Sequence, residues 1–338
     1  MIVIMKPHCT RNQMDHVGHL LDGMGCQHWI IEGSEQSVVE VLGSRDRVDQ
    51  DRLRNAPMVE RVLDRADPIR AARRAPGDRT REIPLGTSGT IGGTKIAVIA
   101  GPCSVESKGQ LMDIAEAVKE AGCAALRGGA FKPRTSPYAF QGLGEQGLEL
   151  LALAGEATGL AIVTEVMSGE DVDLVAKYAD VLQVGSRSMH VTPLLTAVGR
   201  QNKPVLLKRG WSASLSEFLL AAEFIMKLGN EDVILCERGI RTHETFTRNT
   251  LSLAVVPEVK RISTLPIVVD PSHGTGRRHL VAPMSNAAIA CGADGLLIEV
   301  HRDPDNAWTD GEQSLDFDQL RALTRGLTPF ADATGHVM

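Results

Sequence analysis

The sequence predicts an α/β protein, in which a small ferredoxin-like (βαββαβ) domain precedes a (β/α)₈ barrel. Two observations carry this prediction. Eight short apolar runs recur from residue 95 onward, and segments of helical character separate most of them, which is typical of parallel strands covered on both faces. Upstream, short strand-like and helix-like segments follow one another in the ferredoxin-like order.

The ferredoxin-like domain is expected to span residues 1–65. Its clearest helix lies at residues 11–24, where Met14, Val17 and Leu21 recur at helical spacing and Gly25 follows as a terminator. The remaining expected elements are strands at 2–7, 26–31, 37–44 and 59–64, and a polar helix at about 46–56.

Residues 66–94 are expected to form a linker rich in Arg, Gly and Thr that ends in a β-hairpin. The segment GTSGTIGG (86–93) lacks the GK[ST] ending of a phosphate loop and precedes the first barrel strand, so we assign it to a turn. Residues 95–338 then form the barrel. Eight strand–helix units in about 240 residues fit a closed barrel better than the alternative, an open doubly wound sheet.

Composition excludes several classes of function. The 338 residues include 36 Lys plus Arg and 42 Asp plus Glu, which gives a net charge of −6. This acidic balance, with only 4% aromatic residues, argues against nucleic-acid binding. The chain shows no signal peptide and no apolar run long enough to span a membrane. Six scattered cysteines suit a reducing compartment, so we expect a cytoplasmic protein.

A reactive or charged side chain follows every predicted barrel strand. In chain order these residues are Cys103, Arg127, Glu165, Arg187, Lys208 with Arg209, Glu237 with Arg238, Asp270 with His273, and Glu299. The carboxyl ends of barrel strands all face one mouth, so we expect these groups to converge there.

Cations are numerous in this set, although the protein is acidic overall. Those expected at the mouth are Arg127, Lys132, Arg134, Arg187, Lys208, Arg209 and Arg238. Clustered cations need anions to offset their repulsion, and both residue types suit carboxylates and phosphates. We therefore expect phosphorylated small molecules as substrates. The alternative for some of these cations is an internal salt bridge to Glu165 or Glu237.

The strand ends also suggest a metal site. Cys103, His273 and Glu299 end the first, seventh and eighth predicted strands, which are neighbours once the barrel closes, and Asp310 follows in the loop WTDGEQS. A thiolate, an imidazole and two carboxylates suit a divalent transition metal, which leaves Mn, Fe, Co and Zn open. His301, two residues after Glu299, is a rival ligand.

The segment GGAFKPRTSPYAFQGLG forms an unusual loop after the second barrel strand. Its backbone amides, together with Arg134, Thr135 and Ser136, are candidates to hold a phosphate. The alternative is a lid that makes no ligand contact.

Several long motifs resemble one enzyme family, in order and over nearly the whole chain. They are AGPCSVES, LRGGAFKPRTSPYAFQGLG, VTEVM, PVLLKRG, ILCERGIRT, VVDPSHGTGRR, LLIEVH and TDGEQSLD. The sequence resembles 3-deoxy-D-arabino-heptulosonate 7-phosphate (DAHP) synthase, in the class with a short N-terminal ferredoxin-like domain. This resemblance implies condensation of phosphoenolpyruvate with erythrose 4-phosphate, with release of phosphate, at the entry to the shikimate pathway of aromatic amino acid biosynthesis.

The resemblance also implies roles for individual residues. The implied metal ligands are Cys103, His273, Glu299 and Asp310. The implied phosphoenolpyruvate ligands are Arg127, Lys132, Arg187, Lys208 and Arg238, with Ser186 a further substrate-binding candidate. The aldose phosphate would be held by Arg134 and Thr135, with Ser136 assisting. Lys132 would donate a proton, and Glu165 would orient or activate a water molecule.

One loop departs from the family pattern. The chain reads VGSRSMHVTPLL after the fourth barrel strand, where the family typically reads something like GARNMQNFPLL. Arg187 is kept, and the differing positions are Ser186, Ser188, His190, Val191 and Thr192. This departure leaves open which aldose the protein uses. A further alternative is that the protein is a homologue recruited to a related sugar phosphate.

Two alternatives of function remain. The sister family, 3-deoxy-D-manno-octulosonate 8-phosphate synthase, uses arabinose 5-phosphate, but the KPRTS segment here favours erythrose 4-phosphate. A non-catalytic regulatory protein would have little reason to keep the whole set of metal ligands and anion-binding residues.

The N-terminal domain resembles the family's feedback domain, which implies tyrosine or phenylalanine as an effector. The alternative is a domain that serves only packing or dimerisation. We expect a homo-oligomer, either a dimer or a tetramer.

Overall fold

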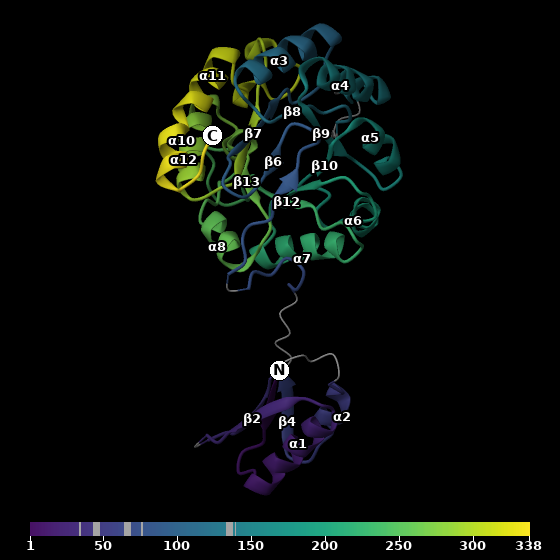
Figure 1. The fold of residues 1–338 in the computed structure, drawn as a ribbon, viewed down its shortest axis with the longest axis vertical. Helices are drawn as coiled ribbons and strands as arrows, with labels where there is room; N and C mark the ends of the chain where they lie inside the picture. The colour runs from purple at the N-terminus through teal and green to yellow at the C-terminus, as the bar shows by residue number, and fades with distance from the viewer. Residues whose placement is uncertain (34, 43–47, 64–68, 76, 133–137, 139) are drawn as a thin grey trace. The chain divides into compact units, whose positions relative to one another are not determined.

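A computed structural model describes residues 1–33, 35–42, 48–63, 69–75, 77–132, 138 and 140–338 of the chain. The chain divides into two compact units, Met1–Pro68 and Ile69–Met338 (Figure 1). Each unit has its own hydrophobic core, and each is described here by itself.

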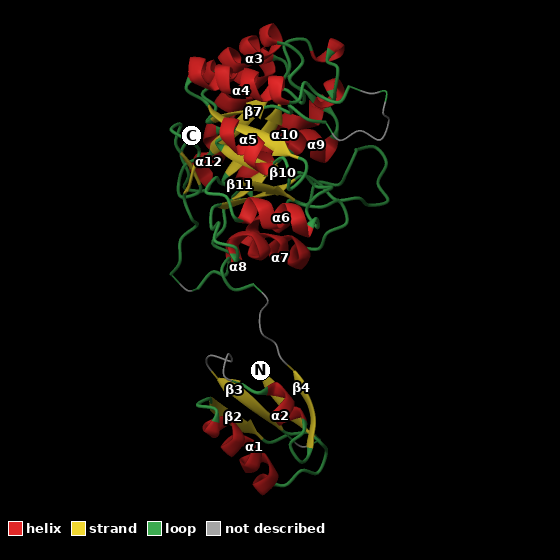
Figure 2. Cartoon of the chain, turned by 90° about the vertical axis from the view of Figure 1, so that its right-hand side faces the viewer, coloured by secondary structure: helices red, strands yellow, loops and turns green. Residues whose placement is uncertain are grey.

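The first unit is a four-stranded antiparallel sheet with two helices, in the predicted βαββαβ order. Its elements are β1 (Ile2–Met5), α1 (Arg11–Gly23), β2 (Gln27–Ile31), β3 (Val38–Leu42), α2 (Gln50–Arg54) and β4 (Val59–Leu63). The strand order is β2-β3-β1-β4, and the helices cover one face of the sheet (Figure 2). Val17 and Leu21 of α1 are fully buried against Val3 and Val39 of the strands, so the helical spacing in the sequence marks the face that packs.

The second unit contains a closed parallel barrel of eight strands, which confirms the predicted fold. The strands are β7 (Ala97–Gly101), β8 (Ala125–Arg127), β9 (Ala161–Val166), β10 (Val181–Val184), β11 (Val205–Lys208), β12 (Val233–Glu237), β13 (Ile267–Val269) and β14 (Gly295–Glu299). The barrel closes where β14 pairs in parallel with β7, which places Glu299 opposite Gly101. Parallel strands buried on both faces explain the continuous apolar runs.

Helices surround this barrel (Figures 1 and 2). They are α3 (Lys108–Glu120), α4 (Glu145–Thr158), α5 (Val172–Tyr178), α6 (Thr192–Gly199), α7 (Leu215–Met226), α8 (Val255–Ile262), α9 (Pro271–Thr275), α10 (Arg278–Ala290), α11 (Phe317–Gly326) and α12 (Thr328–Ala333). Two 3₁₀ turns, η1 (Pro304–Asn306) and η2 (Gly311–Gln313), lie in the loop after β14. Among the described residues, no helix combines the length and apolar character needed to cross a membrane.

A short hairpin packs under the barrel. Its strands, β5 (Ile83–Pro84) and β6 (Thr90–Ile91), pair antiparallel around the turn that contains Gly86. The side chains of Ile83, Leu85 and Ile91 are fully buried, and they share a cluster with side chains of all eight barrel strands, including the first residues of β7, β8, β9 and β10. The hairpin therefore covers the amino-terminal end of the barrel, which leaves the opposite end for the polar strand ends.

Shortening Ile91 to alanine is expected to lower the free energy of unfolding by about 2–5 kcal/mol, because it leaves a cavity between hairpin and strands. Urea unfolding followed by circular dichroism measures this change. Thr90→Ala, on the exposed side of the same strand, is the matched control and should shift stability by less than about 0.5 kcal/mol. Equal effects of the two substitutions would contradict the role of the hairpin.

Candidate active site

A cavity opens at the carboxyl ends of the barrel strands, where the polar strand ends were predicted to converge. It is lined by Cys103, Arg127, Lys132, Glu165, Gln183, Gly185, Ser186, Arg187, Lys208, Trp211, Arg238, Arg248, His273 and Asp310. Ten of these are residues that the sequence singled out as ligands or catalysts. Glu299 lies beneath the lining and is almost fully buried. The predicted phosphate ligands Arg134, Thr135 and Ser136 lie outside the described residues.

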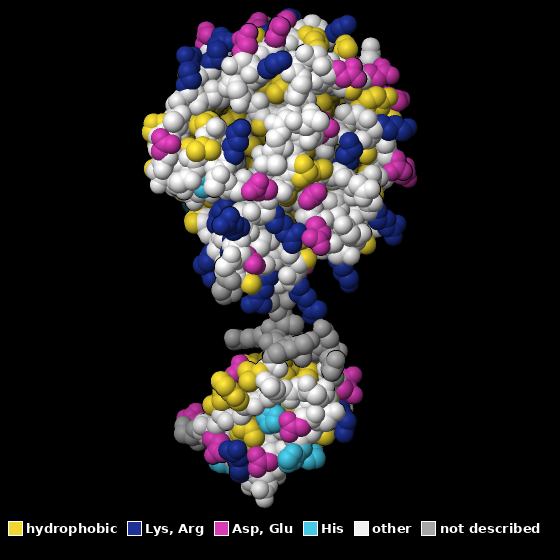
Figure 3. All heavy atoms as spheres, viewed as in Figure 1, with side chains coloured by type: hydrophobic (Ala, Val, Ile, Leu, Met, Phe, Trp, Pro, Cys, Tyr) yellow, Lys and Arg dark blue, Asp and Glu magenta, His cyan; other side chains and the backbone are white. Residues whose placement is uncertain are grey.

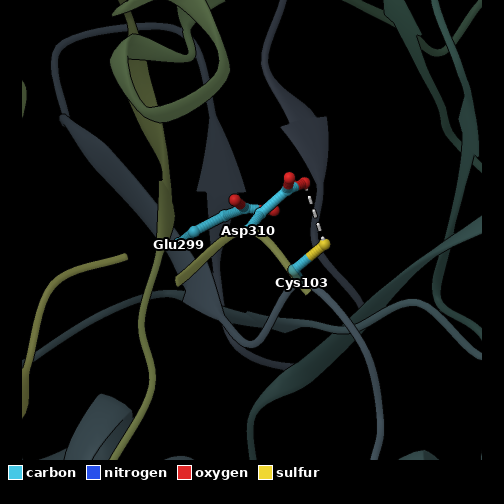
Figure 4. A group of neighbouring side chains, drawn as sticks. All are labelled: Cys103, Glu299 and Asp310. Carbon is cyan, nitrogen blue, oxygen red and sulfur yellow. Dashed lines mark hydrogen bonds between the residues drawn. The ribbon is translucent and has the colours of Figure 1, made fainter. Parts of the chain in front are cut away.

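Three of the four predicted metal ligands form one tight group. The Sγ atom of Cys103 and carboxylate oxygens of Glu299 and Asp310 all lie within 4.8 Å of one another (Figure 4). The thiol of Cys103 donates a hydrogen bond to Oδ2 of Asp310 at 3.3 Å. A thiol between two carboxylates is a donor set that divalent transition metals accept.

The fourth predicted ligand, His273, stands beside this group. Its Nε2 atom lies 3.3 Å from Oε1 of Glu299, and its Nδ1 atom lies 2.8 Å from Oδ2 of Asp270. Oδ2 of Asp270 also accepts a hydrogen bond from Nζ of Lys208 at 2.8 Å. When a carboxylate accepts a hydrogen bond from Nδ1–H, the lone pair of Nε2 can bind a metal, and this is the usual arrangement at metal-binding histidines.

The rival ligand His301 is engaged elsewhere. Its Nδ1 atom lies 2.7 Å from the carbonyl oxygen of Asp303, and its Nε2 atom lies 3.3 Å from Oε2 of Glu106. Both ring nitrogens therefore already have partners away from Cys103. The geometry favours His273 over His301.

Burial and neighbouring charges set the ionisation of three predicted metal ligands, Cys103, His273 and Asp310. Burial, reinforced by the charge of Glu299, raises the pKa of the Cys103 thiol to about 11. Burial also lowers the pKa of His273, which favours the neutral imidazole. At Asp310 burial opposes ionisation, but the charge of Arg248 and the hydrogen bond from Cys103 help to outweigh it and lower the pKa. Near neutral pH the group thus combines a thiol, a neutral imidazole and an ionised carboxylate.

Lys132 reaches into this group from the loop after β8. Its Nζ atom lies 3.1 Å from Sγ of Cys103. The side chain folds over Gly129, where an added Cβ would lie 2.6 Å from Nζ. A residue with a side chain at position 129 would therefore displace the ammonium from the thiol.

Three buried ion pairs stand at the strand ends. Arg127 meets Glu299 at 2.9 Å, Lys208 meets Asp270 at 2.8 Å, and Arg209 meets Glu237 at 2.8 Å. The guanidinium of Arg209 also donates to the carbonyl oxygen of Ala213. The expectation that Arg209 lines the mouth is wrong, because Glu237 holds its side chain outside the cavity. That pairing is the internal salt bridge considered as the alternative.

Some buried polar atoms of the cavity have no hydrogen-bond partner among the described residues. They include the Nη1 atom of Arg238 and the hydroxyl of Ser186. Arg187 and Lys208 line the same space. On the outer face seen in Figure 3, by contrast, basic and acidic side chains of the barrel unit are intermixed. Buried donors without partners indicate an anion site inside the cavity.

Glu165 faces the cavity beside β10. Its Oε2 atom accepts a hydrogen bond from Nε2 of Gln183 at 3.2 Å. A Cβ at position 185 would lie 2.0 Å from Oε1 of Glu165. Gly185 therefore leaves the space that the carboxylate of Glu165 occupies.

Sequence reasoning missed four residues that complete the site. Arg248 donates to Oδ1 of Asp310 at 3.3 Å and to Oε1 of Gln313 at 3.0 Å. Gln313 in turn donates to Glu299, so the two residues brace the carboxylates of the metal-type group. Gln183 and Trp211 line the cavity. Positions within strand β10 and just after β11 were the only signal for these last two.

The fold and this cavity define a barrel enzyme built to bind anionic ligands beside a metal-type donor group. Comparison with known families makes the assignment specific. The family described as "DAHP synthetase I family" matches residues 82–332, and the "DAHP synthase ferredoxin-like domain" matches residues 1–64. The chain belongs to the DAHP synthetase I family, as the sequence motifs predicted.

Individual relatives agree with this assignment. Phospho-2-dehydro-3-deoxyheptonate aldolase of Thermotoga maritima is 45% identical, with 99% of each chain covered. A crystal structure of the enzyme of that name from the same organism superimposes with a TM-score of 0.85 over 99% of this chain and 98% of that one. A 2-dehydro-3-deoxyphosphooctonate aldolase of Geobacter sulfurreducens is 32% identical over 73% of this chain and 97% of its own.

Binding of Mn²⁺ near neutral pH is expected to release about one proton per ion, because Cys103 must lose its proton to become a ligand. With a pKa of about 11, the thiol is protonated below that pH, so metal affinity should rise with pH through this range. His273 and Asp310 need lose no proton. Calorimetry in buffers of different ionisation enthalpy counts the protons.

The test variant is Cys103→Ser, which should bind metal more weakly and release about one proton fewer. Cys291→Ser, at the C-terminal end of α10, is the control and should match the wild-type chain. Unchanged proton release in Cys103→Ser would remove Cys103 from the ligand set.

Proposed function

We propose that this chain is a transferase that condenses phosphoenolpyruvate with erythrose 4-phosphate to give DAHP and phosphate, the first step of the shikimate pathway. The observation that carries the proposal is a single cavity that joins a Cys–Glu–Asp donor group to a cationic pocket. Family membership over both units supports the same reaction.

The cationic half of the cavity suits phosphoenolpyruvate, which carries a carboxylate and a phosphate. Arg127, Lys132, Arg187, Lys208 and Arg238 all line this space. Nη1 of Arg238 and the hydroxyl of Ser186, which have no hydrogen-bond partner among the described residues, supply buried donors for phosphate oxygens. Since these donors sit on strand ends and short loops of a closed barrel, they hold the anion in a fixed position for attack.

The donor half suits a divalent metal, for which Mn, Fe, Co and Zn are the candidates. Cys103, His273, Glu299 and Asp310 would hold it, with Asp270 orienting His273 and Arg248 orienting Asp310. When bound, the metal supplies Lewis-acid polarisation of the aldose carbonyl oxygen.

Lys132 and Glu165 carry the proton and water chemistry of the proposal. Lys132, beside Cys103, donates a proton to the aldehyde oxygen as the enol carbon of phosphoenolpyruvate bonds to the aldehyde carbon. Positive charge then develops at C2 of the former enol; the water oriented by Glu165 and Gln183 adds there and gives one proton to the Glu165 carboxylate. The C2–O bond to the phosphate then breaks, the C2 hydroxyl becomes the ketone as its proton goes to the leaving phosphate, and the arginines hold that phosphate.

The aldose phosphate is assigned to the loop after β8. Arg134 and Thr135, with Ser136 assisting, are proposed for this role from the family motif KPRTS.

The direct test is metal-dependent phosphate release from phosphoenolpyruvate with a panel of phosphorylated aldoses. We expect turnover with erythrose 4-phosphate, loss after chelation, and recovery on adding Mn²⁺. Arabinose 5-phosphate is the comparison substrate. Turnover with arabinose 5-phosphate alone would replace the proposed substrate, and full turnover after chelation would refute the metal role.

The N-terminal unit is proposed to be a feedback domain that binds tyrosine or phenylalanine. Residues 1–64 match the ferredoxin-like domain of the family. Strand β2 leaves Trp29 and Ile31 exposed on the sheet, 64% and 48% respectively. Exposed apolar side chains on a folded sheet suit a contact with an aromatic ligand or another chain.

Deleting residues 1–65 is expected to keep turnover and to abolish inhibition by these amino acids. A structure described as a truncated form of DAHP synthase from Thermotoga maritima supports the folding of such a fragment, since it matches 80% of this chain at 46% identity and a TM-score of 0.74. Rate assays with added tyrosine or phenylalanine compare the two forms. Inhibition that persists in the truncated chain would move the effector site into the barrel unit.

A further inference from the structure

Three guanidinium groups surround the indole ring of Trp211. The Cζ atoms of Arg241, Arg187 and Arg238 lie 4.7, 5.5 and 5.8 Å from the ring centroid. All three distances fall within the range of cation–π contacts. These arginines follow two different strands, β10 and β12, while Trp211 follows β11 between them.

The backbone fixes Trp211 between the loops that carry these arginines. The amide of Arg241 donates to the carbonyl oxygen of Trp211 at 2.8 Å. The amide of the preceding Gly210 donates to Sδ of Met189, in the loop that carries Arg187. The backbone at Gly210 and Trp211 is therefore hydrogen-bonded to both neighbouring loops.

This cluster borders the anion site of the cavity. Trp211, Arg187 and Arg238 all line the cavity, and the Nη1 atom of Arg238 is buried without a hydrogen-bond partner in the part of the chain that the structure describes. Three like charges around one ring repel one another, and the negative face of the indole offsets part of that repulsion. The arrangement keeps guanidiniums close together while leaving a buried donor for a ligand.

We propose that Trp211 is a positioning residue that holds Arg187 and Arg238 at the phosphate end of phosphoenolpyruvate, with Arg241 as a third cation of the same anion site. This inference rests on the proposed function. It separates the roles within the cavity: Trp211 acts on binding of phosphoenolpyruvate, while the proton and water chemistry belongs to Lys132 and Glu165.

The test compares Trp211→Leu, which removes the ring, with Trp211→Phe, which keeps an aromatic face. Phe224→Leu, an aromatic-to-leucine change on α7 at a side chain that is 38% exposed and outside the cavity lining, is the matched control. The full-length, Mn²⁺-loaded chain is assayed for kcat and for the KM of each substrate. Calorimetry measures the Kd of phosphoenolpyruvate, and tryptophan fluorescence is followed during the same titration.

For Trp211→Leu we expect the KM and Kd of phosphoenolpyruvate to rise about tenfold, with kcat and the aldose KM within about twofold. Trp211→Phe should recover at least half of this loss on a logarithmic scale. Phosphoenolpyruvate should change the tryptophan fluorescence of the wild-type chain and of Phe224→Leu, and this change should vanish in Trp211→Phe.

Several outcomes would overturn the proposal: an unchanged Kd in Trp211→Leu, a phenylalanine variant as weak as the leucine variant, or a fall in kcat with KM constant. If Trp211→Leu does not fold, a fluorescence change that persists in Trp211→Phe overturns it. Failure of the wild-type chain to turn over any aldose would refute the proposed function alone, because the calorimetric comparison needs no turnover.

Discussion

The pairing of β14 with β7 is the constraint on which the rest of the site depends. It closes the barrel and sets Glu299 opposite Gly101, two residues before Cys103. Cys103 and Asp310 are 207 residues apart in the chain, yet their side chains share a hydrogen bond. Arg127 reaches Glu299 across the same closure. A slip of register between these two strands would separate the donors and leave buried charges without partners.

Buried charge is concentrated at the same end of the barrel. Arg127–Glu299 and Lys208–Asp270 are almost fully buried, where the cost of desolvation offsets much of the attraction. These pairs are therefore poor sources of stability. Their effect is geometric, since each pair fixes a side chain that also lines the cavity, and Asp270 fixes both Lys208 and His273. These buried pairs therefore add little to the free energy of unfolding, but they hold the side chains of the site in fixed positions.

Sequence reasoning located the strands and most of the residues that line the cavity, because a buried parallel strand requires an apolar run and its end faces the mouth. It failed where a residue's position in the chain does not determine the direction in which its side chain points. Lys208 and Arg209 are adjacent, and successive side chains at a strand end point to opposite sides, so only Lys208 lines the cavity while Arg209 pairs with Glu237. Trp211 and Arg248 lie in loops, where spacing predicts no direction, so only coordinates could place them.

The loop after β10, which is expected from its sequence to depart from the family pattern, lies on one side of the barrel. In the strand order, β10 and β11 lie across from β14 and β7, so the divergent loop faces the metal-type group from the opposite wall. The loop contacts the Trp211 segment through Met189, whose sulfur accepts the amide of Gly210. A change in either segment must therefore be accommodated by the other, whereas the wall that carries Cys103 and Glu299 can stay constant. Variation within this site is thus expected to alter how the anionic substrate is held before it alters the metal-type ligands.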